Sequence, residues 1–358
     1  KWETTEQWNL GFDLSFLQER IGVTVDLYRK TTRDLLLNSN LPLSSGFVSA
    51  MKNIGKVRNQ GIEFTLNTTN IKNKKFEWTS NFNIAFNQNR VIELAEGQSA
   101  LMSAVQFDQN FNQQSSYIAR KGESMGCMYG YIYDGTYKYE DFNKSGDNYT
   151  LKANVPHFAG ETNTQPGMPK YRDINGDGVV DDNDCTIIGN GLPVHTGGFT
   201  NNFAYAGFDL SVFFQWSYGN DILNANRLWF ESSWNKSRDL NQFASYADRW
   251  TPENPTSDIP RATASASNKV FSSRIIEDGS FLRLKTVTLG YTLPKAIVTR
   301  LHIDNLRVYF AAQNLFTITS YSGYDPEVSI RNNALTPGLD FSAYPRARQF
   351  SFGVHLGF

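Results

Sequence analysis

One stretch of the chain carries oxygen-bearing side chains at the spacing of a calcium-binding loop. It reads DINGDGVVDDND from Asp173 to Asp184. In the twelve-residue loop of EF-hand type, ligands occupy positions 1, 3, 5, 7, 9 and 12, and a glycine at position 6 allows a sharp turn. Gly178 occupies that sixth position, and Val179 would bind through its backbone carbonyl. The predicted ligands of a structural Ca²⁺ ion are Asp173, Asn175, Asp177, Val179, Asp181 and Asp184.

The side chain at the last ligand position is shorter than the usual one. Asp184 stands where an EF-hand loop has a bidentate glutamate, and in this it resembles dockerin-type loops, so its carboxylate could bind with one oxygen or more weakly. No helical pattern flanks the motif. The alternative is a turn rich in Asp, Asn and Gly that needs no ion. A Ca²⁺ ion here would hold a loop together and would take no part in catalysis.

No catalytic arrangement is visible in the sequence. The 4 histidines are scattered and form neither an HExxH motif nor the order of a triad. Cys127 and Cys185 make no CxxC motif and no disulfide framework. The formal net charge of −1 argues against nucleic acid as a partner, because nucleic-acid binding requires a basic face. The sequence therefore predicts a protein that is not an enzyme.

Aromatic side chains in the longer connections are candidates for contact with a substrate or a partner. Such rings stack on sugars or anchor a protein surface. The alternative is packing inside the loops or membership of an aromatic girdle at the membrane interface. The candidates are Trp229, Trp234, Trp250, Tyr321 and Tyr324.

The elements that must position these residues show strict alternation of apolar and polar side chains. Period two indicates extended strands with one apolar and one polar face. No apolar run approaches the roughly 20 residues of a membrane-spanning helix. Polar-parity residues such as Asp13, Asp26 and Glu63 would face away from the apolar side, as would Asn81, Asn83, Arg307 and Gln313. The alternation continues to the last residue, where one parity holds Phe350, Phe352, Val354, Leu356 and Phe358.

About eleven strands follow from this pattern, and most have the roughly 9–11 residues needed to cross a bilayer. They are expected at 5–17, 20–31, 55–70, 76–90, 113–121, 126–137, 197–206, 208–219, 281–293, 304–315 and 347–358. Short and long connections alternate between them, with the long ones at about 32–54, 91–112, 138–196, 220–280 and 316–346.

This sorting of connections is typical of outer-membrane barrels, which have short turns on the periplasmic side and long loops outside. The sequence thus predicts an all-β protein, a transmembrane antiparallel β-barrel whose apolar parity faces lipid. A β-sandwich also has alternating inner faces, but it gives no reason for the sorting of the loops.

Several motifs in fixed order then point to one family. They are KWETTEQWNLGFDLSFL at the start, NIGKVRNQGIEF from Asn53, DINGDGVVDDNDCTIIGN from Asp173, GSFLRLKTVTLGYTLP from Gly279, NLFTITSYSGYDPEV from Asn314 and YPRARQFSFGVHLGF from Tyr344. They resemble, from end to end, the C-terminal half of SusC/RagA-type TonB-dependent transporters of Bacteroidetes. The resemblance implies a 22-stranded plugged barrel, of which residues 1–358 would hold about eleven C-terminal strands. The plug domain and the first half of the barrel are expected upstream.

The resemblance also implies a function and partners. It implies TonB-dependent import of large nutrients, glycan oligosaccharides or oligopeptides, across the outer membrane. A SusD-like surface lipoprotein would cap the loop side, and the TonB complex would act through the plug. The multi-pass chain would lie in outer-membrane lipid with its loops on the cell surface, and a higher oligomer is left open. In this family the last strand acts as the barrel-assembly signal, here Phe350, Phe352, Val354, Leu356 and Phe358.

Two other functions fit parts of the sequence. A passive outer-membrane porin would share the barrel but would need no TonB. A secreted calcium-binding β-sandwich protein, either an enzyme or an adhesin, would account for the aspartate-rich loop but not for the terminal aromatic strand.

Overall fold

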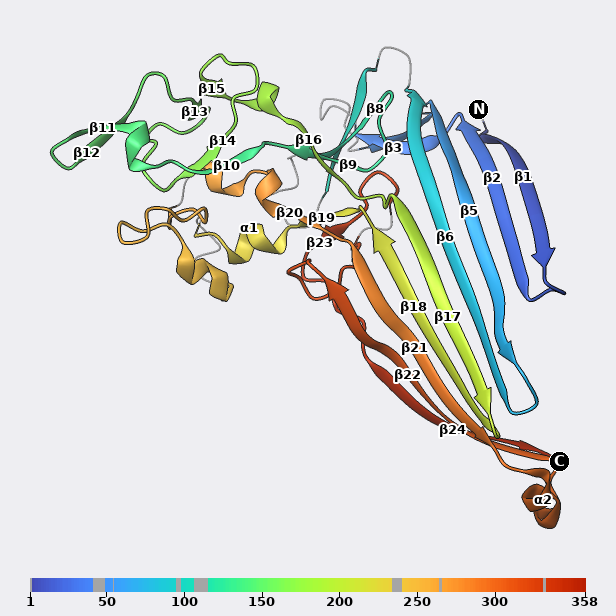
Figure 1. Ribbon diagram of the computed structural model, residues 1–358. Helices are drawn as coiled ribbons and strands as arrows, with labels where there is room; N and C mark the ends of the chain where they lie inside the picture. The colour runs from blue at the N-terminus through green and yellow to red at the C-terminus, as the bar shows by residue number, and fades with distance from the viewer. Residues whose placement is uncertain are drawn as a thin grey trace.

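A curved antiparallel sheet of nine strands dominates the computed structural model, which describes residues 2–40, 49–53, 55–94, 98–105, 115–233, 240–263, 266–330 and 333–358 (Figure 1). Consecutive strands of the sheet are hydrogen-bonded neighbours. In spatial order they are β1 (Thr4–Phe16), β2 (Ile21–Arg33), β5 (Lys56–Lys72), β6 (Phe76–Glu93), β17 (His195–Tyr205), β18 (Phe208–Tyr218), β21 (Phe281–Thr292), β22 (Asn305–Thr319) and β24 (Gln349–Gly357).

The pairing register keeps the apolar side chains of the strands on one side, the apolar face, and in β21 a register shift at Lys285 moves the apolar positions from Leu284 to Val287. One row of paired residues is apolar across eight strands: Leu14, Val23, Leu66, Phe82, Phe199, Phe214, Leu284 and Phe316. The adjacent row belongs to the opposite side, the polar face, and holds Ser15, Gly22, Asn67, Asn81, Thr200, Phe213, Thr286, Gln313 and Gln349. A slip of one residue would exchange the two faces, so the sequence pattern fixes the register.

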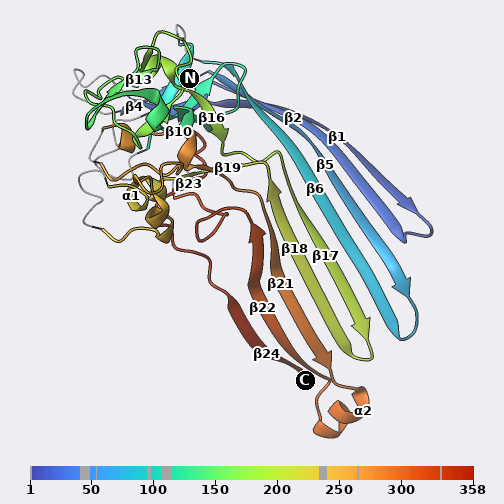
Figure 2. The ribbon, with the colours of Figure 1, turned by 60° about the vertical axis from the view of Figure 1, so that its left-hand side comes forward.

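The connections sort to the two ends of this sheet. Short turns at 17–20, 73–75, 206–207 and 293–304 lie at one end, together with α2 (Lys295–Val298) and the C-terminus (Figure 2). The described parts of the long connections 34–55, 94–194, 219–280 and 320–348 lie at the other end. The all-β class is confirmed, and short and long connections alternate along the nine-stranded sheet. Among the described residues, no helix has the length and apolarity required to cross a membrane.

Two of the eleven expected strands do not enter this sheet. The described parts of the segments 113–121 and 126–137 form β8 (Ser115–Arg120), β9 (Cys127–Gly130) and β10 (Tyr133–Thr136), which are too short to cross a bilayer. Tyr117 on β8 and Met128 on β9 are fully buried, so these strands pack inside a protein core. Because β6 pairs directly with β17, the loops expected at 91–112 and 138–196 belong to a single connection, 94–194.

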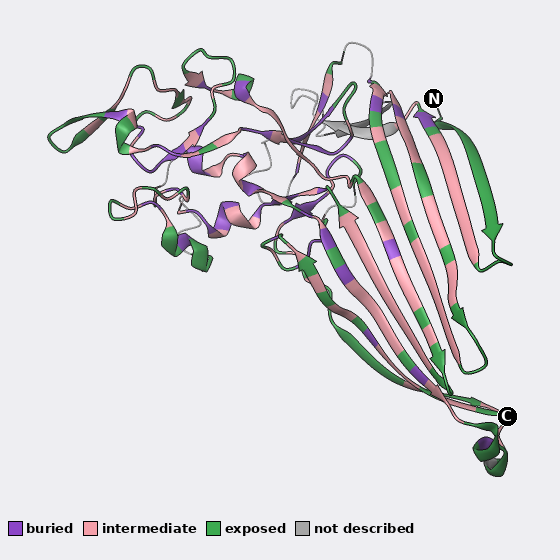
Figure 3. Ribbon diagram, in the orientation of Figure 1, coloured by how far each residue is buried: buried purple, intermediate pink, exposed green. Residues whose placement is uncertain are grey.

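The described parts of 94–194, 219–280 and 320–348 fold together into what we call the loop domain. Most of the buried residues lie here (Figure 3). Its largest apolar cluster joins all three connections through residues such as Tyr117, Leu223 and Leu339. One sheet has the order β16-β9-β8-β7, with β7 (Ala100–Ala104) and β16 (Thr186–Asn190), and another has the order β20-β19-β23, with β19 (Asp221–Asn224), β20 (Ile276–Asp278) and β23 (Leu339–Asp340).

The remaining elements are short. Two-stranded pairs join β3 (Leu36–Asn40) to β4 (Ser49–Asn53), β11 (Phe142–Ser145) to β12 (Asn148–Leu151), β13 (His157–Phe158) to β15 (Val179–Val180), and β10 to β14 (Pro169–Tyr171). The helical turns are α1 (Asn226–Phe230), η2 (Tyr139–Asp141), η3 (Asp182–Asp184), η5 (Ala244–Asp248), η6 (Ala266–Lys269), η7 (Ser273–Ile275) and η8 (Thr299–Leu301).

Candidate functional site

The polar face of the nine-stranded sheet carries hydrogen-bonded amide, hydroxyl and carboxylate groups. Asn81 Nδ2 donates to Asn67 Oδ1 at 2.6 Å, and Thr24 Oγ1 donates to Asp13 Oδ1 at 2.7 Å. Arg307 donates two hydrogen bonds to the carboxylate of Asp209. Such a surface suits contact with water, polar solutes or another polar surface. By register, this face holds the expected polar-parity residues Asp13, Asp26, Glu63, Asn81, Asn83, Arg307 and Gln313.

A buried arginine fastens the 320–348 connection to the sheet. Arg283 on β21 donates from Nη2 to Asp325 Oδ1 at 2.6 Å and from Nη1 to Glu327 Oε2 at 2.8 Å. Its Nε donates to Thr317 Oγ1 on β22 at 2.9 Å. All three guanidinium nitrogens are thus satisfied, which a buried charge requires. The motif segments GSFLRLK and SGYDPEV meet at this point, although nothing in the sequence pattern marked Arg283 itself.

Two further cations lie beside Glu327, one of these two carboxylates. Lys285 Nζ lies 3.3 Å and Arg346 Nη2 lies 3.4 Å from Glu327. Burial raises the pKa of Asp325, but hydrogen bonds from Arg283 and from the backbone N–H groups of Glu327 and Arg346 outweigh it, so the pKa is lowered. Both acids therefore have cationic partners, and the Arg283 cluster (Arg283, Lys285, Asp325, Glu327 and Arg346) has a structural role.

The aspartate-rich loop folds as a tight turn held by its own carboxylates. Fully buried Asp184 accepts hydrogen bonds from the N–H groups of Ile174 at 2.7 Å and Asp181 at 2.9 Å. Asp173 accepts from Gly178 N–H at 2.8 Å. Gly178 has φ +89°, which explains the glycine at the sixth position of the motif. Burial raises the pKa of Asp184, but these backbone hydrogen bonds outweigh it and lower the pKa.

The geometry of this loop is that of an Asx-rich turn, with its carboxylates directed at backbone N–H groups. Within the described ranges, no group of three or more His, Cys, Asp or Glu side chains converges as a metal site would require. The oxygen donors of Asp173, Asn175, Asp177, Asp181 and Asp184 are nevertheless grouped in a single turn of twelve residues, as the motif predicts. The Ca²⁺ ion remains a prediction.

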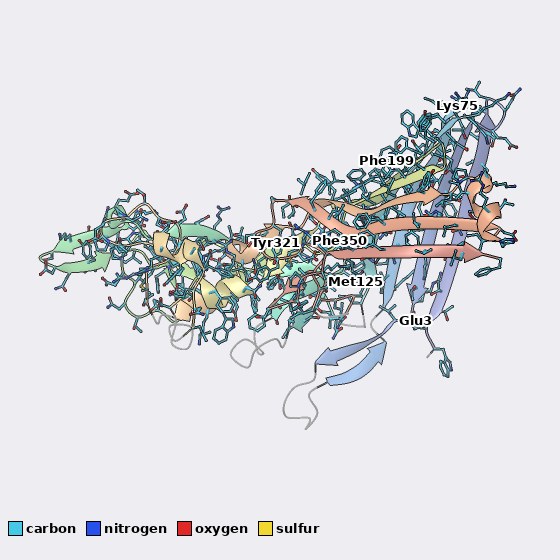
Figure 4. The ribbon with its side chains drawn as sticks, turned by 90° about the horizontal axis from the view of Figure 1, so that it is seen from below. Glu3, Lys75, Met125, Phe199, Tyr321 and Phe350 are labelled. Carbon is cyan, nitrogen blue, oxygen red and sulfur yellow. The ribbon has the colours of Figure 1, made fainter. Side chains whose placement is uncertain are left out.

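Three of the five aromatic candidates are packed inside the loop domain. Trp229 is 7% exposed and lies against Phe341, and Trp250 is 4% exposed. Tyr321 is 5% exposed and donates its hydroxyl to Asp340 at 2.5 Å (Figure 4). These rings stabilise the loops, which was the alternative interpretation, because the loop domain has a core of its own. Tyr324 is 84% exposed, and Trp234 lies outside the described residues.

The last strand presents its apolar parity outward. In β24, Phe352 pairs with Phe310 and Val354 pairs with Val308 of β22. The five residues Phe350, Phe352, Val354, Leu356 and Phe358 are all exposed, as expected for a strand that continues the apolar face.

Comparison with known proteins assigns the chain to a family. Residues 1–315 match the family model described as TonB dependent receptor-like, beta-barrel. The chain belongs to this TonB-dependent receptor family. Its members are outer-membrane proteins that cross the bilayer with strands, so the apolar face is the lipid-facing side of a barrel wall.

Relatives and solved structures agree with the family. The chain is 35% identical over 363 residues to the TonB-dependent receptor P3 of Formosa agariphila, covering 100% of this chain and 34% of that relative. It is 27% identical over 360 residues to the TonB-dependent receptor SusC of Bacteroides thetaiotaomicron, covering 100% of this chain and 32% of SusC.

The solved structure of the RagAB peptide transporter has the same fold, with a TM-score of 0.79 and 24% identity over 100% of this chain and 36% of that chain. The chain thus spans about a third of the length of the proteins it matches. The barrel-wall fold predicted from the motifs is confirmed.

Proposed function

We propose that this TonB-dependent receptor chain is the wall and loop side of an importer that carries large nutrients, glycan oligosaccharides or oligopeptides, across the outer membrane. The observation that carries the proposal is the match to this family combined with a sheet that has one lipid-facing and one polar side. The chain is similar to the TonB-dependent receptor SusC and shares its fold with the peptide transporter RagAB, and the second likeness supports import of a solute such as a peptide.

The unpaired edges of the sheet indicate that it is part of a larger barrel. β1 pairs only with β2, and β24 pairs only with β22, within the described residues. Open edges are unsatisfied in hydrocarbon, so both would pair with further strands of a longer protein. The polar face would then line the lumen and contact a plug, through which the TonB complex acts.

The loop domain is the proposed docking surface for a SusD-like lipoprotein on the cell surface. Long connections that are ordered and have their own core are usually functional. Among the aromatic candidates that the structure describes, Tyr324 on the 320–348 connection is the exposed one and is available for such contact. A higher oligomer of the transporter–lipoprotein pair is compatible with this arrangement.

Uptake by whole cells tests the proposed function. We expect cells with the full-length protein to take up a fluorescent oligosaccharide or oligopeptide, and to lose this uptake when TonB is deleted or the proton gradient is collapsed. Deletion of the gene for the SusD-like lipoprotein should reduce uptake of the same solute. Uptake that persists without TonB would show a passive channel and would contradict the proposal.

We also propose that the loop 173–184 holds a structural Ca²⁺ ion, since its oxygen donors follow the twelve-residue spacing. Removal of the ion with a chelator should speed proteolysis between Asp173 and Asp184, because the carboxylates would then repel one another. Ca²⁺ should restore protection, and the variant Asp177→Asn should need more of it. Equal cleavage with and without chelator would instead establish the ion-free turn.

The terminal strand is the proposed barrel-assembly signal. Deleting Phe358 should lower the amount of full-length protein in the outer membrane, because the last exposed aromatic ring of the apolar face is removed. The amount is measured by immunoblot of membrane fractions, with Gly357→Ala as a control that keeps the ring. Normal membrane levels after the deletion would contradict this role.

A further inference from the structure

At the loop end of the sheet, the apolar face changes abruptly into a basic surface. The last apolar row holds Leu27, Ile62 and Phe86. The next two rows on the same face place Arg29 beside Trp8 and Gln60, and Arg58 beside Thr31 and Arg90. Further toward the loops, Arg33 pairs with Lys56. We call Arg29, Arg33, Lys56, Arg58 and Arg90 the basic patch.

Two adjacent hollows lie over the basic patch and share Trp8 and Arg29. The smaller, of about 240 Å³, is also lined by Arg33, Lys56 and Arg58, with Glu6 as its acidic residue. The larger, of about 820 Å³, reaches from Arg90 to apolar side chains that include Ile62, Phe86, Leu192 and Val194. The hollows therefore combine a cationic part with an apolar part.

The charges of the basic patch exceed what the protein neutralises. Arg33 is paired with Glu6 at 3.0 Å. Arg29, Arg58 and Arg90 have no carboxylate within 4.0 Å among the described residues, and the buried Nε of Arg58 has no hydrogen-bond partner there. The nearby Glu123 is already bound to Arg120 at 3.4 Å, and Glu93 stands opposite Lys56 in the register. The buried N–H donor of Arg58 has no protein partner and is therefore open to an anion.

The depth of the basic patch along the barrel wall favours lipid phosphate as the anion. Successive rows on one face of a strand are about 6.8 Å apart, so the guanidinium groups begin one row beyond the hydrocarbon edge, at the depth of lipid head groups. Guanidinium groups bind phosphate in bidentate fashion, and basic pockets beside membrane-spanning segments bind anionic head groups. The apolar part of the larger hollow then suits an acyl chain.

We propose that the basic patch binds the phosphate groups of an acylated, phosphorylated glycolipid of the outer leaflet. The orientation of the barrel, with its loops on the cell surface, is taken from the proposed function. The glycolipid would cover the wall between β1 and β6 and hold the upper ends of these strands at a fixed depth in the membrane.

Lipid retention tests the proposal on the full-length protein that contains this chain. Protein extracted from outer membranes in mild detergent is assayed by mass spectrometry for bound phosphorylated glycolipid. The triple variant Arg29→Gln, Arg58→Gln, Arg90→Gln should retain at least about tenfold less glycolipid than the unmodified protein, given the contribution of each cation near a membrane surface. Heat-modifiable migration in electrophoresis verifies that each variant is folded.

A matched variant removes the same charge from the opposite end of the sheet. Lys72 ends β5, and Lys74 and Lys75 lie in the turn between β5 and β6. Figure 4 shows Lys75 far from the loop domain. Their replacement by glutamine should leave retention unchanged. Equal retention by all three proteins, or an equal loss in both variants, would overturn the proposal.

The source of the phosphate is resolved by reconstitution in phosphatidylcholine nanodiscs. Diphosphorylated lipid A added to the nanodiscs should bind, whereas the same lipid treated with phosphatase should bind at least about tenfold less. Millimolar inorganic phosphate should not displace the lipid, and complete displacement would show a free-anion site instead. Import is measured in a separate assay. Import that does not depend on TonB would contradict the proposed function, but it would not change the amount of glycolipid bound.

Discussion

Replacing Arg283 with alanine should destabilise the full-length protein by about 3–5 kcal/mol, the cost of removing one partner from a buried ion pair. The guanidinium is 3% exposed and holds Asp325 and Glu327, whose side chains are 11% and 18% exposed. Without it, two carboxylates remain at the base of the 320–348 connection with fewer cations to neutralise them. We therefore expect this connection to detach from the sheet before the barrel unfolds.

Limited proteolysis of the 320–348 connection measures this effect, and Arg346→Gln is the matched control. Arg346 also contacts Glu327, but its side chain is 49% exposed, so its loss should cost at most about 1 kcal/mol. If Arg283→Ala and Arg346→Gln are cleaved at the same rate, Arg283 does not hold the 320–348 connection to the sheet as its contacts indicate.

The same cluster has a defined response to acid. Because the pKa of Asp325 is lowered in the folded protein, its contribution to stability is fully present above the unfolded pKa of about 3.9 and is lost as the pH falls through the folded pKa. Protection of the 320–348 connection should therefore be constant near neutral pH and decline only in strong acid. Arg283→Ala should weaken this acid dependence.

Phe214→Arg should destabilise the barrel by about 2–4 kcal/mol more than Phe213→Arg, because an arginine on the lipid face near mid-membrane has that cost. The two residues are neighbours of the same type on β18. Phe214 pairs with Phe199 and Leu284 on the apolar face, whereas Phe213 pairs with Thr200 and Thr286 on the polar face. Both variants lose one aromatic ring, so the difference between them reports the medium that each face meets.

Denaturant unfolding of the full-length protein in lipid vesicles gives the two free energies, and membrane fractionation gives the amounts assembled. The conservative variants Phe213→Leu and Phe214→Leu control for lost packing and should differ little from one another. Equal destabilisation by the two arginine variants would mean that the apolar face does not contact hydrocarbon.

The sequence alone determined which side of each long strand is apolar, because side-chain direction in a strand depends only on local period. Leu14 and Phe310 are far apart in the chain, yet the pattern within each strand was enough to assign both to the apolar parity. The sorting of short and long connections was local information as well, and the motif order led to the correct family.

Only the tertiary structure decided which β segments form the barrel wall and which aromatic rings are buried. The alternation in 113–121 and 126–137 resembles that of wall strands, but Tyr117 and Met128 are buried by Leu223 and Leu339 from other connections. Arg283 likewise acquires its role from Asp325, which lies 42 residues away. Contacts of this kind depend on how separate connections pack together, and no periodicity within one segment records them.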